Sequence, residues 1–284
     1  MTDLLSIIVS GLLMGAIYAL LAGGLTLIWG VMRIINLAHG EFLMLGAFAT
    51  WYFAGSGLVP LLALPVIAPA FFVLGVAVYL LVIRRIVDAP ELMSLLLTFG
   101  LSIFILNVGV IVWSGEMRLV SYLSGSFDIG GVRVSKSRLV AGVIAVAISL
   151  AMYAFLQRSR WGQAIRAVAW DRQIAEQCGI DSARIYMLVF GLGTLLAAAA
   201  GGLASTIFAF NPLVGQQFIL KAFAVTVLGG MGNFAGALIA GLMLGVIEQV
   251  VSFFIDSQVA SAVAFIVIIG TLLFRPQGIM GGSG

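Results

Sequence analysis

Residues 4–29 read LLSIIVSGLLMGAIYALLAGGLTLIW, an apolar run without a charged side chain. An α-helix rises about 1.5 Å per residue, so a run of this length can cross the roughly 30 Å hydrocarbon core of a membrane. A strand of a membrane barrel would alternate apolar and polar residues at every second position, and this run does not. The stretch therefore predicts a membrane-spanning helix.

Similar runs follow along the rest of the chain. They lie at residues 37–55, 59–83, 92–113, 139–156, 184–209, 233–253 and 258–274, with a shorter run at 214–230. The composition agrees, because 62% of the 284 residues are hydrophobic and 9% are charged, whereas about 25% of a typical soluble domain is charged. We predict an all-α fold over residues 1–284: a single polytopic transmembrane bundle of eight or nine segments with interrupted helices.

Several functional classes are disfavoured by the composition. The only cysteine is Cys178 and the only histidine is His39, which excludes an intramolecular disulfide framework and argues against a metal site built on several of these residues. No GxSxG or GxxxxGK[ST] motif occurs, so neither nucleophilic catalysis nor nucleotide binding by a phosphate loop is expected. The net charge of +3 is small and unevenly spread, which indicates membrane topology and not nucleic-acid binding.

Basic residues predict which loops share a side of the membrane. Arg33, the pair Arg84–Arg85 and five arginines within 158–184 fall in alternate loops. Lys and Arg concentrate in cytoplasmic loops, so we place these loops in the cytoplasm and the N-terminus, which has no cleavable signal pattern, outside. Arg275 also favours the cytoplasm, which requires either that 214–230 is a ninth crossing or that the C-terminus breaks the positive-inside rule.

Residues 114–138 then form an extracytoplasmic, periplasmic loop. The segment is rich in Gly, Ser and charge, and a short hairpin is expected around Gly130–Gly131. Its four basic residues conflict with the positive-inside rule. The alternative orientation would place the five arginines of 158–184 outside, which conflicts with the rule more strongly.

The loop 157–183, here called the hook, contains RSRWGQAIRAVAWDRQIAEQCGID from residue 158. It is too short and too charged to span a membrane, yet Trp161, Ile165 and Val168 recur at helical spacing. We expect Gly179 to end its helix and Asp181 to cap the next helix. One interpretation is a solvated linker. The apolar stripe favours the other, a cytoplasmic helix that fits a cleft on a partner protein.

Asn36, His39 and Glu41 form a polar break between two apolar runs. Ionisable groups at membrane depth are costly and usually functional. The alternative is an interfacial turn, with Asn36 as helix cap and Glu41 near the positive helix end. A proton relay through His39 is disfavoured, because a chain of further Asp, Glu or His residues is missing from the runs.

Two five-residue words suggest related halves. LAGGL at 21–25 and AAGGL at 199–203 are each followed by a polar break with glycine, at 36–41 and at 229–233. Paired interrupted helices are typical of transporters, with the site between them. The candidates for lining a translocation path are Asn36, His39, Glu41, Gly229, Gly230 and Asn233.

Other motifs have a structural interpretation. The pairs Gly11/Gly15 and Gly241/Gly245 have GxxxG spacing, which allows membrane helices to approach closely. Lys221 is expected to extend toward a membrane interface, and Glu248 to lie near a helix end. A lipid-modifying enzyme would need a catalytic constellation, which the sequence does not offer.

Four segments together resemble the permeases of branched-chain amino-acid ABC importers, of the LivH type. They are GLLMGAIYALLAGGLTLIWGVMRIINLAHGEFLMLGA at 11–47, RAVAWDRQIAEQCGID at 166–181, VLGGMGNFAGALIAGLMLGVIE at 227–248 and RPQG at 275–278. The words NLAHGE and VLGGMGN in this order are specific to that family. The resemblance covers nearly the whole chain.

The resemblance implies a multi-pass subunit of the bacterial inner membrane, surrounded by lipid. It would pair with a homologous LivM-type permease, two cytoplasmic ATPase subunits and a periplasmic substrate-binding protein. ATP and magnesium would bind to the ATPases, so this chain would need no cofactor and would not be an enzyme. The hook would be the coupling helix, with Ile165 and Val168 on the contact face. The coupling residues implied are Trp161, Ile165, Arg166, Val168, Arg172, Glu176 and Gly179.

The substrate stays open at this point. Branched-chain or other neutral amino acids are expected, but permeases for urea, short-chain amides and carboxylates belong to the same family. A carrier driven by a proton or sodium gradient is a further alternative. Alternating access, driven by ATP through the hook, is the expected mechanism.

Overall fold

The computed structural model describes residues 2–129 and 132–281. Within these ranges, seven helices are long and apolar enough to cross a membrane. They are α1 (Thr2–Met32), α3 (Leu64–Leu81), α4 (Glu91–Trp113), α5 (Lys136–Arg158), α8 (Ser182–Ser205), α10 (Phe234–Phe254) and α11 (Ser257–Phe274). Two more apolar helices are shorter, α2 (His39–Gly55) and α9 (Val214–Gly229). The predicted polytopic helical bundle is confirmed.

The two glycine pairs of the sequence pack against each other. A Cβ built on Gly245 would lie 2.4 Å from the Cα of Gly15 and 2.4 Å from the carbonyl oxygen of Gly11, and one built on Gly15 would lie 2.6 Å from the carbonyl oxygen of Gly241. Only glycine permits backbones to approach this closely. The antiparallel pair α1 and α10 is therefore held together by both predicted GxxxG motifs.

The helix order supports two related halves. In α1–α4 and again in α8–α11, a long helix (31 and 24 residues) is followed by a shorter one and then by two further apolar helices. α2 has 17 residues and α9 has 16, so each extends about 24–26 Å at 1.5 Å per residue. Each follows a non-helical segment, at 33–38 and 206–213. The second break thus lies at 206–213, whereas 229–233 is a tight turn between α9 and α10.

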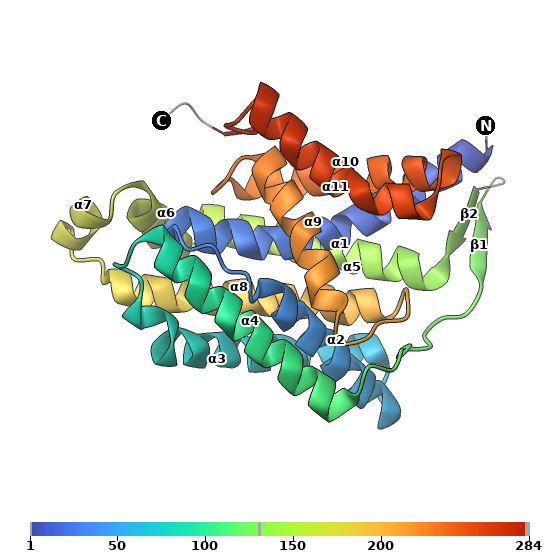
Figure 1. The fold of residues 1–284 in the computed structure, drawn as a ribbon, viewed down its shortest axis with the longest axis horizontal. Helices are drawn as coiled ribbons and strands as arrows, with labels where there is room; N and C mark the ends of the chain where they lie inside the picture. The colour runs from blue at the N-terminus through green and yellow to red at the C-terminus, as the bar shows by residue number, and fades with distance from the viewer. Residues whose placement is uncertain (1, 130–131, 282–284) are drawn as a thin grey trace.

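One end of the bundle carries a β-hairpin. Strands β1 (Ser126–Ile129) and β2 (Val132–Ser135) pair antiparallel, as the sequence of the 114–138 loop predicted, while its turn at Gly130–Gly131 lies outside the described residues. The backbone of Arg118 pairs with that of Phe210. The hairpin and the start of α1 lie together at the right of Figure 1.

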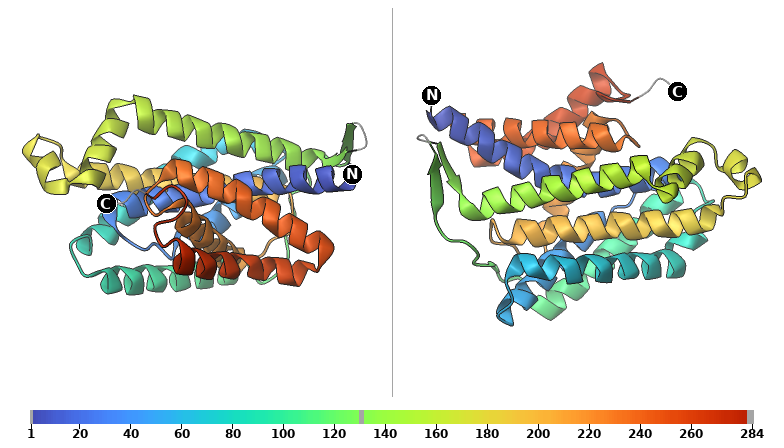
Figure 2. Two further views of the ribbon diagram at one scale, coloured as in Figure 1. Left: turned by 90° about the horizontal axis from the view of Figure 1, so that it is seen from above. Right: turned by 180° about the vertical axis from the view of Figure 1, so that it is seen from behind.

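The hook lies at the opposite end (Figures 1 and 2). It contains two helices, α6 (Arg160–Trp170) and α7 (Arg172–Gln177). Arg33 and Glu91 line a cavity together with Trp170 of the hook. A short 3-10 helix, η2 (Ile83–Arg85), is followed by Asp88, which forms an ion pair with Arg172 of the hook. A second 3-10 helix, η1 (Pro60–Ala63), precedes α3. The loops with predicted cytoplasmic arginines therefore share one end, and Met280 near the C-terminus lines the same cavity.

Candidate functional site

The hook is built from two capped helices. The Ser159 hydroxyl accepts a hydrogen bond from Gly162 N at 2.8 Å and starts α6, and the Asp171 carboxylate accepts one from Ile174 N at 3.0 Å and starts α7. Such caps satisfy amide groups that the first helical turn leaves free. Gly179 follows α7 with φ of +83°, and the Asp181 carboxylate accepts a hydrogen bond from Arg184 N at 3.2 Å. Both predicted boundaries, at Gly179 and Asp181, are confirmed.

The apolar stripe of the hook faces the chain's own bundle. Ile165 is 2% exposed and Val168 is 3% exposed, and both belong to the main hydrophobic core. The expectation that these two side chains form the contact face for a partner is therefore corrected. Burial of an aliphatic side chain contributes about 1.5–3 kcal/mol, so their role in this structure is to hold α6 against the bundle.

Two further contacts fix α6 to the end of α5. Gly162 lies so close to Leu156 that a Cβ would stand 2.2 Å from its carbonyl oxygen. The Arg166 guanidinium donates a hydrogen bond to the same carbonyl oxygen of Leu156. Arg166, an expected coupling residue, thus braces the hook on the residues just before it.

Three large apolar side chains of the hook face outward. Trp170 is 90% exposed, Ile174 is 58% exposed and Trp161 is 53% exposed. The predicted apolar stripe consists of Trp161, Ile165 and Val168, and only Trp161 among these three is exposed. Trp170 and Ile174 were not among the predicted coupling residues, although their position beside the helix break at Asp171 could have suggested them. Exposed aromatic and aliphatic side chains in this otherwise polar segment are the candidates for contact with another protein.

Arg172 connects the hook to two other elements. Its guanidinium forms an ion pair with Asp88, which follows η2, and a second one at 2.9 Å with Glu176 in the next turn of α7. It also lies over the Tyr186 ring of α8, 5.5 Å from the ring centre. Hydrogen bonds with Glu176 and then Asp88 raise the pKa of Arg172 further above its usual range. The predicted coupling residues Arg172 and Glu176 therefore form part of the tether of the hook.

The polar break before α2 lies inside the bundle. Asn36, His39 and Glu41 are each at most 1% exposed. The His39 ring nitrogen Nε2 lies 3.0 Å from the Leu21 carbonyl oxygen, and Glu41 Oε1 accepts a hydrogen bond from Ser102 Oγ at 3.0 Å. An interfacial turn capped by Asn36 is not what forms here, because Ala38 holds the cap position of α2 and makes no side-chain cap.

Some polar atoms of this break have no partner among the described residues. They are both side-chain polar atoms of Asn36, Nδ1 of His39 and Oε2 of Glu41. An unpaired buried polar group costs about 1–3 kcal/mol. Groups kept at that cost are often functional, which supports this segment as part of a translocation path.

The two shorter helices, α2 and α9, begin at the same place. A Cβ on Gly40 would lie 2.3 Å from the Gly215 carbonyl oxygen, and one on Gly215 would lie 2.8 Å from Glu41 Oε2. The first turns of α2 and α9 are therefore in backbone contact, with the Glu41 carboxyl beside them.

The turn at 229–233 has a mainly structural arrangement. Gly230 has φ of +99°. A Cβ on Gly229 would lie 2.5 Å from the Gly236 backbone. The Asn233 side chain caps α10 through a 2.9 Å hydrogen bond from Gly236 N, and its amide donates to the Met280 carbonyl oxygen at 2.7 Å.

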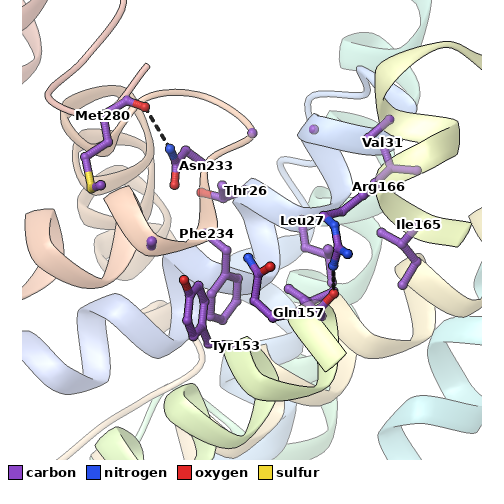
Figure 3. A pocket seen from close by; sticks show the side chains of 15 residues that line it. Thr26, Leu27, Val31, Tyr153, Gln157, Ile165, Arg166, Asn233, Phe234 and Met280 are labelled. Carbon is purple, nitrogen blue, oxygen red and sulfur yellow. Dashed lines mark hydrogen bonds between the residues drawn. The ribbon is translucent and has the colours of Figure 1, made fainter. Parts of the chain in front are cut away.

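A cavity of about 410 Å³ opens beside this turn at the hook end (Figure 3). Its lining includes Asn233, Met280, Tyr153, Gln157 and Arg166. The break residues 36–41 do not line it. The six predicted path residues therefore fall into two separate groups, one in the bundle interior and one at the hook end.

The structure also brings together two charges that sequence reasoning left without a role. The Lys221 ammonium of α9 forms an ion pair with Glu248 of α10 and donates a 2.9 Å hydrogen bond to the Tyr18 hydroxyl of α1. The expected snorkelling of Lys221 to an interface does not occur. The sequence feature that could have predicted this ion pair is the presence of one lysine and one glutamate in two consecutive apolar runs.

Comparison with known proteins matches residues 7–272 to the family described as the branched-chain amino acid transport system / permease component. The high-affinity branched-chain amino acid transport system permease protein BraD of Pseudomonas aeruginosa is 35% identical, over 96% of this chain and 94% of that protein. LivH of Escherichia coli K12, described in the same words, is 31% identical over the same shares. A probable LivH of Methanocaldococcus jannaschii is 27% identical, over 92% of this chain and 88% of that protein. The chain therefore belongs to the family of branched-chain amino acid transport system permease components.

Proposed function

We propose that this chain is the permease subunit of an ATP-binding-cassette importer that moves branched-chain amino acids across the bacterial inner membrane. The observation that carries the proposal is the hook: a folded, capped and tethered segment that presents Trp161, Trp170 and Ile174 outward at one end of a membrane bundle. A chain without a phosphate loop needs another subunit to hydrolyse ATP. The relatives named above are permeases of branched-chain amino acid transport.

The proposed assembly contains three kinds of partner protein. A homologous LivM-type permease pairs with this chain in the lipid bilayer. Two ATPase subunits with bound ATP and magnesium bind on the cytoplasmic side, and the hook docks in a cleft of one of them. A periplasmic binding protein delivers the amino acid at the hairpin end. This chain itself performs no chemical step and binds no metal or cofactor.

In the proposed mechanism, closure of the ATPases moves the hook, and the hook moves the bundle. α6 is packed into the core through Ile165 and Val168, and Arg172 links α7 to Asp88. A displacement of the hook is therefore transmitted to α5, α8 and the loop before α4. The bundle then alternates between outward and inward openings, and the break before α2 lines the path.

Reconstitution tests this function. The chain is purified with its co-purifying subunits, placed in liposomes and supplied with binding protein and radiolabelled leucine. We expect uptake that requires internal ATP and stops when the ATPases are omitted. Uptake by this chain alone, driven by a proton or sodium gradient, would show a secondary carrier instead. ATP-driven uptake of urea or a short-chain amide in place of leucine would keep the importer and reject the amino-acid substrate.

A further inference from the structure

A charged cluster lies between α1, α9 and α10. Lys221 is paired with Glu248, and their side chains are 16% and 18% exposed. The Lys221 ammonium also lies 4.8 Å from the centre of the Tyr18 ring and 5.7 Å from that of Phe218. The cluster is thus mostly enclosed, but neither charged group is sealed from the surface.

The open side of the cluster continues into a polar helix face. Gln217 lies one helical turn before Lys221, and Gln216 directly precedes Gln217 in the chain. Both glutamines are exposed, and so is Leu220. Residues three and four apart lie on one face of a helix. A face with two amides and an ion pair is expensive to expose to hydrocarbon. This side of α9 therefore faces water or protein in the membrane.

We propose that Lys221 and Glu248, together with Tyr18, form a binding site for the zwitterionic group of an amino acid on its way through the permease. Lys221 binds the α-carboxylate and Glu248 binds the α-ammonium group. This inference rests on the proposed transport function and names the residues that recognise its substrate class.

The exchange of partners conserves charge. In the resting state each side chain neutralises the other, and with substrate bound each faces the opposite charge of the zwitterion. One ion pair within the protein is replaced by two ion pairs between the protein and the zwitterion, so neither buried charge is left unpaired. A molecule with one charge leaves one of the two side chains unpaired. A neutral amide or urea cannot replace the ion pair at all, so the site selects zwitterions.

Comparison of single and double variants separates this role from a structural one. Lys221→Met and Glu248→Leu each leave one buried charge unpaired, and the double variant leaves none. Replacement of a buried ion pair by apolar residues is often tolerated. We expect the double variant to fold and to co-purify with its partner subunits in the same yield as the parent. Leucine uptake should fall at least tenfold. Recovery of uptake in the double variant to within twofold of the parent would overturn the proposal.

A control variant removes a polar side chain outside this cluster. The exposed Asn107 side chain donates a 2.7 Å hydrogen bond to the Ile103 carbonyl oxygen of its own helix, α4. We expect Asn107→Ala to leave uptake unchanged. If the unmodified transporter itself takes up no leucine with ATP, the proposed function fails before any variant is compared. Loss of uptake in the double variant alone concerns the binding site.

Thiol labelling provides a second test that does not depend on the double variant. Cys178 is the only cysteine of the chain, so Cys178→Ala gives a background into which Gln217→Cys is placed. A membrane-impermeant maleimide should label this position in the complete transporter faster than a cysteine at Phe104, an exposed residue within apolar α4. Leucine should slow the labelling, whereas isoamylamine and 4-methyl-2-oxopentanoate, which each lack one charged group, should not. Labelling no faster than at Phe104, or equal protection by urea, would overturn the proposal.

Discussion

The Cα of Gly15 in α1 lies where a side chain on Gly245 in α10 would have to be, because a Cβ on Gly245 would stand 2.4 Å from it. This contact joins the first long helix of the chain to the tenth helix in sequence order. Tyr18 of α1 accepts a hydrogen bond from Lys221 of α9. The packing of α1 against α10 therefore sets the space in which the charged cluster forms.

Gly245→Ala should destabilise the bundle. The added methyl group meets backbone atoms that cannot rotate away, and overpacking of this kind costs about 1–3 kcal/mol. We expect a thermal midpoint lower by several degrees, at roughly 2–4 °C per kcal/mol for a domain of this size, in a fluorescence-detected unfolding assay of the purified complex. Gly270→Ala is the control, because Gly270 in α11 has no atoms within 4 Å of an added Cβ and alanine favours a helix by up to about 1 kcal/mol. Equal midpoints for the two variants would contradict the close packing.

Outward and inward side chains of the hook should respond differently to substitution. Trp170→Ala removes an exposed side chain, so we expect ATP hydrolysis stimulated by binding protein to fall at least fivefold with an unchanged thermal midpoint. Ile165→Ala empties part of the core and should cost about 2–5 kcal/mol of stability. Both are measured on the purified transporter. If Trp170→Ala lowers stability and leaves coupling intact, the outward face of the hook is not the contact surface.

Trp170 is exposed and Ile165 is buried, and this difference shows what the sequence can predict and what it cannot. The sequence predicts the hook from its charge and its helical spacing, the boundaries at Gly179 and Asp181 from capping residues, and the glycine pairs from their GxxxG spacing. Each of these features depends on local backbone chemistry or on neighbours within one helix. Helical periodicity also placed Ile165 and Val168 on one face. It could not tell whether the chain's own bundle or another protein covers that face, since this depends on how α6 folds back on α5.

The same limit applies to the charged residues. Local sequence shows that Lys221 lies in an apolar segment, but its partner Glu248 is 27 positions later in another helix. The recurring word AAGGL at 199–203 led to a second break predicted at 229–233. The break that precedes the shorter helix α9 lies at 206–213 and contains Asn211-Pro212, whereas 229–233 is more glycine-rich.

The Arg172–Asp88 pair should hold the hook in place more than it stabilises the whole protein. Exposed ion pairs contribute about 0–1 kcal/mol, so Asp88→Asn should lower the thermal midpoint by little. The tether between α7 and the loop before α4 is lost, however, and we expect faster amide hydrogen exchange in residues 171–181. Glu176→Gln is the control, because it removes the pair within α7 and leaves the one to Asp88. Equal exchange in both variants would show that the tether has no effect on the hook.

The two hydrogen bonds of Asn233 can be separated by substitution. Its Oδ1 caps α10 at Gly236 N, and its Nδ2 donates to the Met280 carbonyl oxygen. Asn233→Asp keeps the cap and loses the donor, so it should release the segment 278–281 with little loss of stability. Asn233→Ala loses both and should cost a further 0.5–2 kcal/mol or so, the usual worth of an N-cap.

Limited proteolysis and thermal unfolding measure these two effects independently. Both variants should be cleaved near the C-terminus faster than the parent, and only Asn233→Ala should unfold at a clearly lower temperature. Asn107→Ala is the control, since the Asn107 amide donates to the Ile103 carbonyl oxygen of its own helix α4 at an exposed position. Because Met280 and Asn233 both line the cavity beside the hook, release of the C-terminal segment should also widen that cavity. If Asn233→Asp is cleaved as slowly as the parent, the backbone bonds of Ile279 and Met280 to Leu228 and Gly229 are sufficient to hold the segment, and Asn233 serves α10 alone.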